Sequence, residues 1–109
     1  MNHNSKQNQK VKIVWSPLSV DRVTEIAEYI AIDNPEAATD WIETLFGFVD
    51  QLKSFPRSGR IVPEIDEETI RELITGNYRV VYRVELKQVT ILTVRHIRQI
   101  LPESELESK

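Results

Sequence analysis

The stretch from Ile70 to Val84, IRELITGNYRVVYRV, constrains the fold more than any other part of the chain. Two runs of β-forming residues flank Gly76-Asn77, a pair that favours a tight hairpin turn. In the second run, aromatic or aliphatic residues alternate with arginine, and neighbouring side chains of a strand point to opposite faces of its sheet. That strand is therefore predicted to have an apolar face (Tyr78, Val80, Tyr82, Val84) and a cationic face (Arg79, Val81, Arg83).

The first half of the chain predicts a strand followed by two helices. Residues 10–15 (KVKIVW) alternate in part, as a strand does. Apolar residues then recur at helical spacing over 18–32 and over 35–55, and the tryptophans and phenylalanines there are predicted to lie in the core. Ser16-Pro17 and Asn34-Pro35 each combine a capping residue with a proline suited to the first helical position. Because the break between the helices is so short, they are expected to form an antiparallel hairpin.

The second half predicts a three-stranded antiparallel meander over residues 69–74, 78–85 and 89–95. Residues 61–68 (IVPEIDEE), with a proline and four acids, predict an exposed connection. A helical turn is expected between His96 and Leu101. The predicted fold class is α+β, with one mostly antiparallel sheet, the helical hairpin on one face and the other face open and polar.

Domain organisation follows from these elements. Residues 1–9 are predicted to be a disordered polar tail, residues 10–101 a single domain, and residues 102–109 a polar C-terminal tail. With 109 residues, the chain is long enough for one hydrophobic core but not for two.

Composition excludes several kinds of protein. The chain has no cysteine, so it has no disulfide, no thiolate metal site and no cysteine nucleophile, which fits a reducing cytoplasm. The N-terminal residues MNHNSKQNQK do not resemble a signal peptide, and no apolar run approaches the roughly 20 residues that a membrane span needs. His3 lies in the polar tail, so a metal site shared with His96 is not expected, and neither is a cofactor.

Positive charge is concentrated in the second half, although the whole chain has a net charge of −3. Residues 1–55 carry five Lys/Arg against eight Asp/Glu, whereas residues 56–101 carry eight against six, and seven of those eight are arginine. Because a guanidinium stays charged and offers a fixed fork of donors, this distribution indicates a local site for anions.

Arginines on the cationic strand face are the first candidates for that site. Arg79 and Arg83 are about 13 Å apart at roughly 3.3 Å per residue, and Arg71 is expected near them across the hairpin. The alternative is a solvated face on which Glu72 and Glu85 are surface partners of these arginines. The charges alone do not decide between the two.

His96 and the loop PRSGR are weaker candidates. His96 lies between Arg95 and Arg98, whose charges favour its neutral form, as a general base requires. The alternative is a packed or solvated residue at a strand end. Arg60 and its neighbours could offer donors to an anion, but the spacing in PRSGR matches no phosphate-binding loop.

Taken in order, four segments resemble the RelE/ParE superfamily of bacterial toxins: WSPLSVDRVTEIAEYIA, PRSGRIVPE, IRELITGNYRVVYRV and ILTVRHIRQIL. The resemblance covers residues 11–101. It implies a type II toxin–antitoxin system, such as those that stabilise plasmids, in which a cognate antitoxin wraps the toxin and folds as it binds.

The superfamily contains two mechanisms, and the resemblance favours one of them. RelE-like toxins cleave mRNA on the ribosome with lysines on the strand before G-x-Y-R, the arginine of that motif, and a late arginine and tyrosine. Here Arg79 matches the motif arginine, but Ile70 and Glu72 occupy the lysine positions and Leu101 lies near the place of the tyrosine. ParE-like toxins instead inhibit DNA gyrase.

The ParE-like branch is therefore preferred, with no catalytic residue implied. It assigns recognition of the target or the antitoxin to six residues: Arg60, Arg71, Arg79, Arg83, His96 and Arg98. The nuclease alternative would make Arg79, His96 and Arg98 catalytic and the ribosome with its mRNA the target. An inactive relative kept as a binding module is the third possibility.

Overall fold

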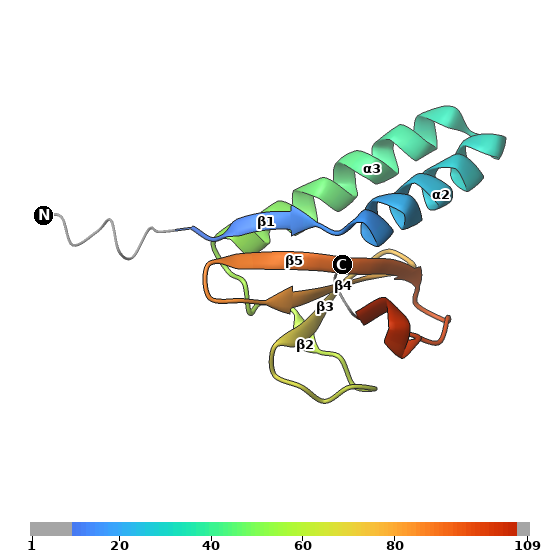
Figure 1. Cartoon of the computed structure of the whole chain (residues 1–109). Coiled ribbons are helices and arrows are strands. Elements are labelled where there is room, and N and C mark those ends of the chain that lie inside the picture. Colours follow the sequence, from blue (N-terminus) through green and yellow to red (C-terminus); the bar gives the residue numbers. More distant parts are fainter. Residues whose placement is uncertain (1–9, 107–109) are drawn as a thin grey trace, which may run out of the picture.

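A helical hairpin lies across one face of a five-stranded sheet in the computed structural model, which describes residues 10–106 (Figure 1). The α+β class predicted from the sequence is confirmed. The elements in chain order are β1 (Lys12–Trp15), α2 (Pro17–Asp33), α3 (Pro35–Asp50), the 3₁₀ turn η1 (Gln51–Lys53), β2 (Arg60–Ile61), β3 (Ile70–Thr75), β4 (Tyr78–Val84), β5 (Gln88–His96) and the 3₁₀ turn η2 (Glu103–Leu106).

The strand order is β1-β5-β4-β3-β2, so β1 and β2 form the two edges. The meander β3-β4-β5 is antiparallel, as predicted, whereas β1 lies parallel to β5. The long connection from β1 to β5, which includes both helices and strands β2 to β4, permits that parallel pairing. A register shift in the β4–β5 ladder follows Val81, and Leu92 and Thr93 of β5 are both buried there.

Both helices begin as their sequences predict. The side chain of Ser16 accepts a hydrogen bond from the Ser19 amide, and that of Asn34 accepts one from the Ala37 amide. In each helix a proline follows the cap, where its missing N–H costs no helical hydrogen bond. The second helix ends at Asp50 rather than at Phe55, because the chain tightens into η1.

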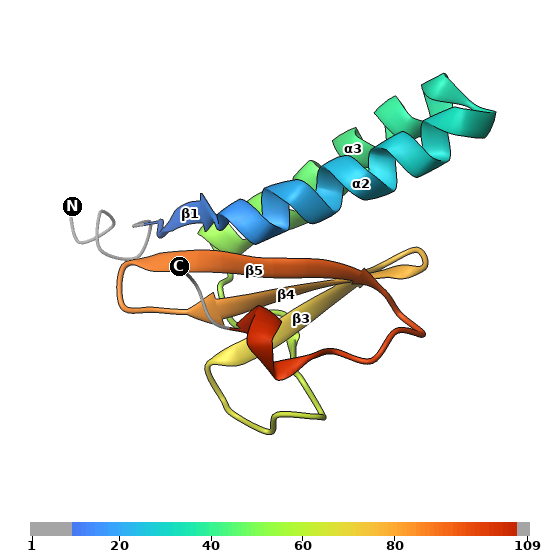
Figure 2. The ribbon, with the colours of Figure 1, turned by 45° about the vertical axis from the view of Figure 1, so that its right-hand side comes forward.

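The main core lies between the helical hairpin and the sheet (Figure 2). The apolar face predicted for β4 contributes to it, together with Leu45, Val49 and Leu52 and with Val89, Ile91 and Val94 of β5. Burial of such side chains is the dominant stabilising term in a domain of this size.

The opposite face of the sheet is covered, and the prediction of an open polar face was wrong. A second apolar cluster there consists of Val62, Ile70, Val81, Leu92 and Leu101, with Ile65 and Leu106 packed against it. It is enclosed by the connection from β2 to β3 and by η2, which lie below the sheet in Figures 1 and 2.

Two connections between elements differ from their predicted structure. Residues 61–68 were expected to be exposed, but Ile61 pairs with β3 as part of β2 and Val62 is fully buried. The turn expected between His96 and Leu101 is not helical; the short helix comes later, at Glu103–Leu106, within the segment expected to be a polar tail. The tail predicted over residues 1–9 lies outside the described residues. Between residues 10 and 106, no helix combines the length and apolar character needed to cross a bilayer.

Candidate functional site

Arg79, the central residue of the predicted cationic face, is enclosed by carboxylates. Only 5% of its surface is exposed. Its Nε donates to Glu72 Oε1 at 2.7 Å, and its two terminal nitrogens donate to the two oxygens of Glu64 at 2.8 Å each. The hydrogen bonds from Arg79 lower the pKa of Glu64 to about 2. This guanidinium is therefore part of an internal ion-pair network.

Glu72 is the buried anion of that network. Its side chain is fully shielded from solvent, and its second oxygen accepts a hydrogen bond from Arg60 Nε at 2.6 Å. A carboxylate in such a place is stable only when neighbouring cations and donors compensate the loss of hydration. The alternative interpretation was thus right that Glu72 pairs with an arginine of this face. The pair is buried, however, rather than solvated on the surface.

Arg71 does not join Arg79, because the register of β3 on β4 places it opposite Tyr82. It therefore lies on the other face of the sheet, and the expectation that it would stand near Arg79 was wrong. Its guanidinium donates to the carbonyls of Arg57, Gly59 and Glu68 and so fastens the PRSGR loop. The Gly59 amide in turn donates to the buried hydroxyl of Tyr82 at 2.9 Å.

Arg83 fastens the C-terminal segment. Its Nη2 donates to the carbonyl of Leu106 at 2.8 Å, at the end of η2. Glu105, on the same turn, accepts hydrogen bonds from Arg22, Arg95 and Thr93. Burial tends to raise the pKa of the Glu105 carboxyl, but these three donors together lower it.

His96 and Arg98 lie at the far end of β5. The ring of His96 packs edge-on against Tyr78, with ring centroids 5.5 Å apart, and its Nδ1 accepts a hydrogen bond from the Arg98 amide. Because β5 pairs His96 with Tyr78, its side chain lies on the helical side of the sheet, whereas Arg79 is buried on the other. The three residues that a nuclease would use are therefore not brought together.

Apart from Arg98, the cations without an ion pair in residues 10–106 are lysines that the sequence analysis passed over. Lys10, Lys12 and Lys87 are exposed and form no ion pair within residues 10–106. The Lys12 amide donates to the Lys87 carbonyl at 3.2 Å, so the start of β1 lies beside the β4–β5 turn. The three residues are far apart in sequence, and only the parallel pairing of β1 with β5 brings them together.

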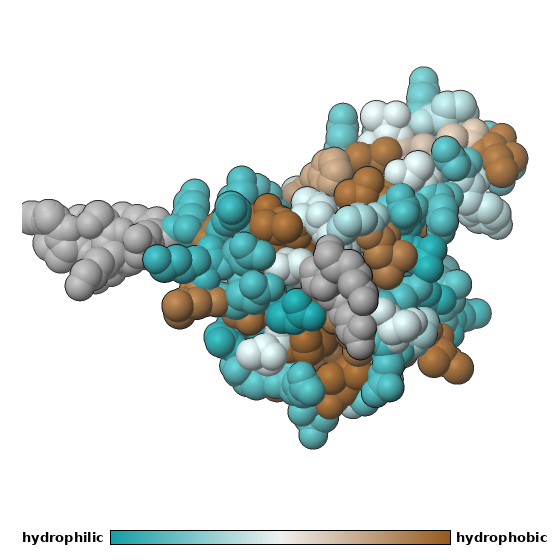
Figure 3. Space-filling view, in the orientation of Figure 1, coloured by the Kyte–Doolittle hydropathy of each residue, from teal (hydrophilic) through white to brown (hydrophobic). Residues whose placement is uncertain are grey.

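An apolar groove runs between the two helices and is the second feature that sequence reasoning missed. We call it the helical groove; it has a volume of about 460 Å³ and is lined by Trp15, Val20, Val23, Thr24, Ala27, Glu28, Ile42 and Phe46. Val20 and Phe46 are 49% and 48% exposed, and apolar surface is visible along the hairpin in Figure 3. Phe46, predicted to lie in the core, instead rests edge-on against Trp15, and Phe55 is exposed as well.

Exposed apolar side chains gathered in one groove are typical of a surface that binds another protein. Residues 10–106 contain no group of three or more His, Cys, Asp or Glu able to hold a metal ion. The described surface thus offers an apolar groove, a cluster of free lysines and arginines that are mostly neutralised.

The chain matches a known protein family over most of its length. A family model described as "ParE toxin of type II toxin-antitoxin system, parDE" matches residues 13–101. A protein of Sinorhizobium fredii (strain NBRC 101917 / NGR234), named "Putative toxin Y4kP", is 36% identical over 94 residues, which cover 84% of this chain and 94% of that protein.

Solved structures share the fold. A chain of the chromosomal ParDE system of P. aeruginosa superposes with a TM-score of 0.66 at 19% identity, over 81% of this chain and 97% of its own length. A chain of the toxin–antitoxin complex RelBE2 from Mycobacterium tuberculosis gives a TM-score of 0.54 at 20% identity, over 80% of this chain and 91% of its own length.

Proposed function

The chain belongs to the ParE family of type II toxin–antitoxin toxins, and we propose that it inhibits DNA gyrase and is neutralised by an antitoxin bound in the helical groove. Membership is consistent with the exposed apolar groove, and within residues 10–106 Arg79 lies on the other face of the sheet from His96. It leaves open in principle both mechanisms of the wider superfamily, and the arrangement of Arg79 favours the one without catalysis.

The environment of Arg79 is the observation that carries the choice. A nuclease must present donors to the charge that develops on the scissile phosphate. Here the guanidinium is enclosed by Glu64 and Glu72, which would repel a phosphate. Of the two positions where RelE-like toxins carry lysines, Ile70 is buried in the second apolar cluster and Glu72 is itself an anion.

The surroundings of His96 do not favour a role as a general base. No carboxylate or hydroxyl among residues 10–106 forms a hydrogen bond with its ring, and its Nδ1 accepts a hydrogen bond from the Arg98 amide. A histidine base is normally held in one tautomer by such a partner. Inhibition of an enzyme through a bound surface requires none of these groups.

Only the exposed cations among the six residues predicted for recognition are then available to contact the target. Arg60 has an exposed side chain although it pairs with Glu72, and Arg98 is exposed without an ion pair in the described chain. Arg71, Arg79 and Arg83 hold loops or the C-terminal turn in place. We therefore assign target contact to Arg60 and Arg98, and structural roles to the other three.

The helical groove suits the apolar face of an antitoxin helix. A partner helix would place apolar residues at i, i+3, i+4 and i+7 against Val20, Phe46 and Trp15. An antitoxin segment that folds on binding would cover a large surface there and block access to the hairpin.

Induced expression in bacteria, with two readouts from the same cells, tests the target. We expect growth arrest, a DNA-damage response and DNA cleaved by gyrase, with mRNA 5′ ends unchanged, and co-expression of the antitoxin should restore growth. Cuts within translated codons, without cleaved DNA, would instead identify a ribosome-dependent nuclease.

A further inference from the structure

Arginines and lysines differ in how many of them form ion pairs. In residues 10–106, each of the arginines except Arg98 forms an ion pair with a carboxylate: Arg22, Arg57, Arg60, Arg71, Arg79, Arg83 and Arg95. Of the lysines in that range, only Lys53 is paired, with the exposed Asp50. Uncompensated positive charge therefore comes mainly from lysine.

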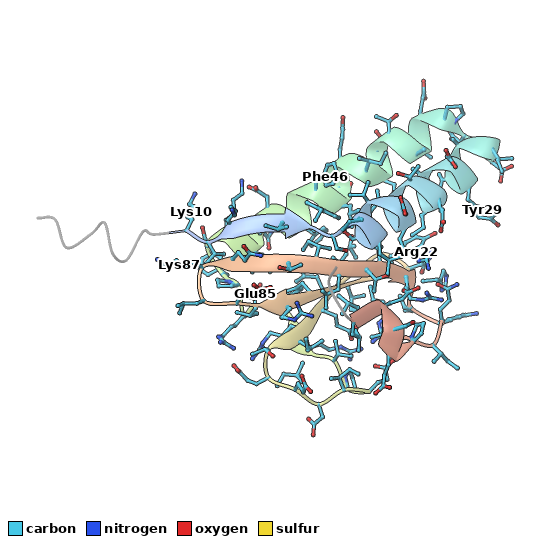
Figure 4. All side chains as sticks on the ribbon, in the orientation of Figure 1. Lys10, Arg22, Tyr29, Phe46, Glu85 and Lys87 are labelled. Carbon is cyan, nitrogen blue, oxygen red and sulfur yellow. The ribbon has the colours of Figure 1, made fainter. Side chains whose placement is uncertain are left out.

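These lysines meet at one end of the molecule. The Val11 amide donates to the Lys53 carbonyl at 3.0 Å, and the Lys12 amide donates to the Lys87 carbonyl at 3.2 Å. A depression of about 350 Å³ is lined by Lys10, Lys12 and Lys87 together with Val11 and Leu86. Figure 4 shows Lys10 and Lys87 at the same end of the sheet, and we call the group Lys10, Lys12, Lys53 and Lys87 the lysine end.

A further depression lies between the helical groove and Lys53 of the lysine end. This depression of about 320 Å³ beside the edge strand β1 is lined by Ile13, Trp15, Phe46, Val49, Asp50 and Lys53. It shares Trp15 and Phe46 with the groove and Lys53 with the lysine end. A chain that leaves the groove along β1 would therefore reach the lysines.

We infer that the lysine end binds an acidic segment of the antitoxin, adjacent in its sequence to the segment in the groove, and thereby accelerates association. The inference rests on the proposed function, because it takes the groove as the antitoxin site. Complementary charges raise the rate at which two proteins meet by a factor of about 10 to 10³, whereas apolar contacts mainly set how slowly they part.

A short acidic peptide fits these charges better than a nucleic acid does. Duplex DNA carries a charge about every 1.7 Å and extends well beyond a patch of four lysines. It would lie against the remaining surface of a protein whose net charge is −3. A peptide of a few residues experiences only charges within a Debye length, about 8–10 Å, and Lys10, Lys12 and Lys87 have no ion-pair partner there among residues 10–106.

Association kinetics of the full-length toxin and its cognate antitoxin test the inference. In Lys10→Gln/Lys12→Gln/Lys87→Gln, we expect the association rate at about 50 mM salt to fall about 10-fold and its salt dependence to flatten. The dissociation rate should change less than about 3-fold. Because the three side chains are exposed, folding should be unaffected, which the thermal midpoint checks. Arg57→Gln removes an exposed arginine that already pairs with Glu68; it serves as the control and should leave the association rate unchanged.

An unchanged association rate in the triple variant would overturn the inference, and so would an equal effect of Arg57→Gln. If the triple variant binds antitoxin normally but loses affinity for a duplex DNA probe, the lysines serve nucleic acid and the inference also fails. The groove variant Val20→Glu separates the two proposals: if it binds antitoxin normally, the groove assignment fails. If it abolishes binding while the triple variant keeps its rate, only the lysine assignment fails.

Discussion

Arg79 Nε donates to Glu72 Oε1 at 2.7 Å in the interior of the protein, between the sheet and the segment that covers it. The contact joins neighbouring strands, since Glu72 lies on β3 and Arg79 on β4. Glu64, from the covering segment, completes the network with two further hydrogen bonds from Arg79. The network thus links the sheet to the covering segment, and its removal should lower the stability of the protein.

Arg79→Ala should lower the free energy of unfolding by about 3–5 kcal/mol, because it removes the buried cation that pairs with the Glu72 carboxylate and leaves only the exposed Arg60. Urea denaturation measures the change. Arg98→Ala, which removes an exposed arginine without an ion pair in the described chain, should stay within about 0.5 kcal/mol of the unaltered protein. A cost below about 1 kcal/mol for Arg79→Ala would contradict the network.

Stability should fall in acid through Glu64. The pKa of this carboxyl is about 2 in the folded chain, against 4.5 for an ordinary glutamate, because Arg79 donates to it. A lowered folded pKa contributes stability that is present above the ordinary value and is lost as the pH falls from 4.5 towards 2.

Glu64→Gln isolates that contribution. Denaturation midpoints of both proteins, followed from neutral pH into acid, should differ most at neutral pH and converge near pH 2, the folded pKa of Glu64. Other carboxyls with lowered pKa, those of Glu68 and Glu105, leave a slope in both proteins. Parallel curves for the two proteins would show that Glu64 contributes nothing.

Gly59 is required by close packing rather than by its backbone angles. A Cβ at this position would lie 2.5 Å from the carbonyl oxygen of Glu72 and 2.6 Å from the hydroxyl of Tyr82. Gly59→Ala should therefore destabilise the protein by more than about 2 kcal/mol, since backbone or the buried tyrosine must move.

Gly47→Ala is the matched control. Nothing lies within 4 Å of a Cβ placed there, in the last turn of α3, and alanine should stabilise the helix by about 0.5–1 kcal/mol. Thermal or urea unfolding of both variants gives the comparison. Equal effects of the two substitutions would exclude close packing as the role of Gly59.

Local patterns predicted the elements well because each rests on neighbouring residues. Alternation in Tyr78–Val84 identified the two faces of β4, and the Ser-Pro and Asn-Pro pairs located both helix starts. The observed ends of the elements differ from the predicted ones where tertiary packing overrides the local sequence pattern. The predicted end of the second helix, for example, is the 3₁₀ turn η1.

Local patterns could not predict whether the sheet face that bears Arg79 is open or covered. Whether the face is open depends on Val62, Ile65 and Leu106, which belong to acidic segments typical of exposed connections. Only the folded chain shows that their few apolar residues turn inward while Glu64 and Glu105 meet arginines from other strands. The lysine end was hidden for a related reason, because its members come from distant segments.

Val20→Glu should weaken antitoxin binding at least about 100-fold, because a carboxylate in the helical groove would lose hydration without gaining a partner. Titration calorimetry with the purified antitoxin measures the change. Ile32→Glu, on the same helix but outside the groove lining, is the control and should bind normally. Equal affinities for the two variants would place the antitoxin elsewhere.

The most direct measurement of the central claim places the purified toxin in two reconstituted reactions: gyrase with supercoiled plasmid, and translating ribosomes with a defined mRNA. If Arg79 is enclosed for structure and not exposed for catalysis, gyrase-cleaved DNA should accumulate with toxin concentration, antitoxin should suppress it, and the mRNA should stay intact. Codon-specific cleavage of the mRNA, with gyrase unaffected, would contradict the account.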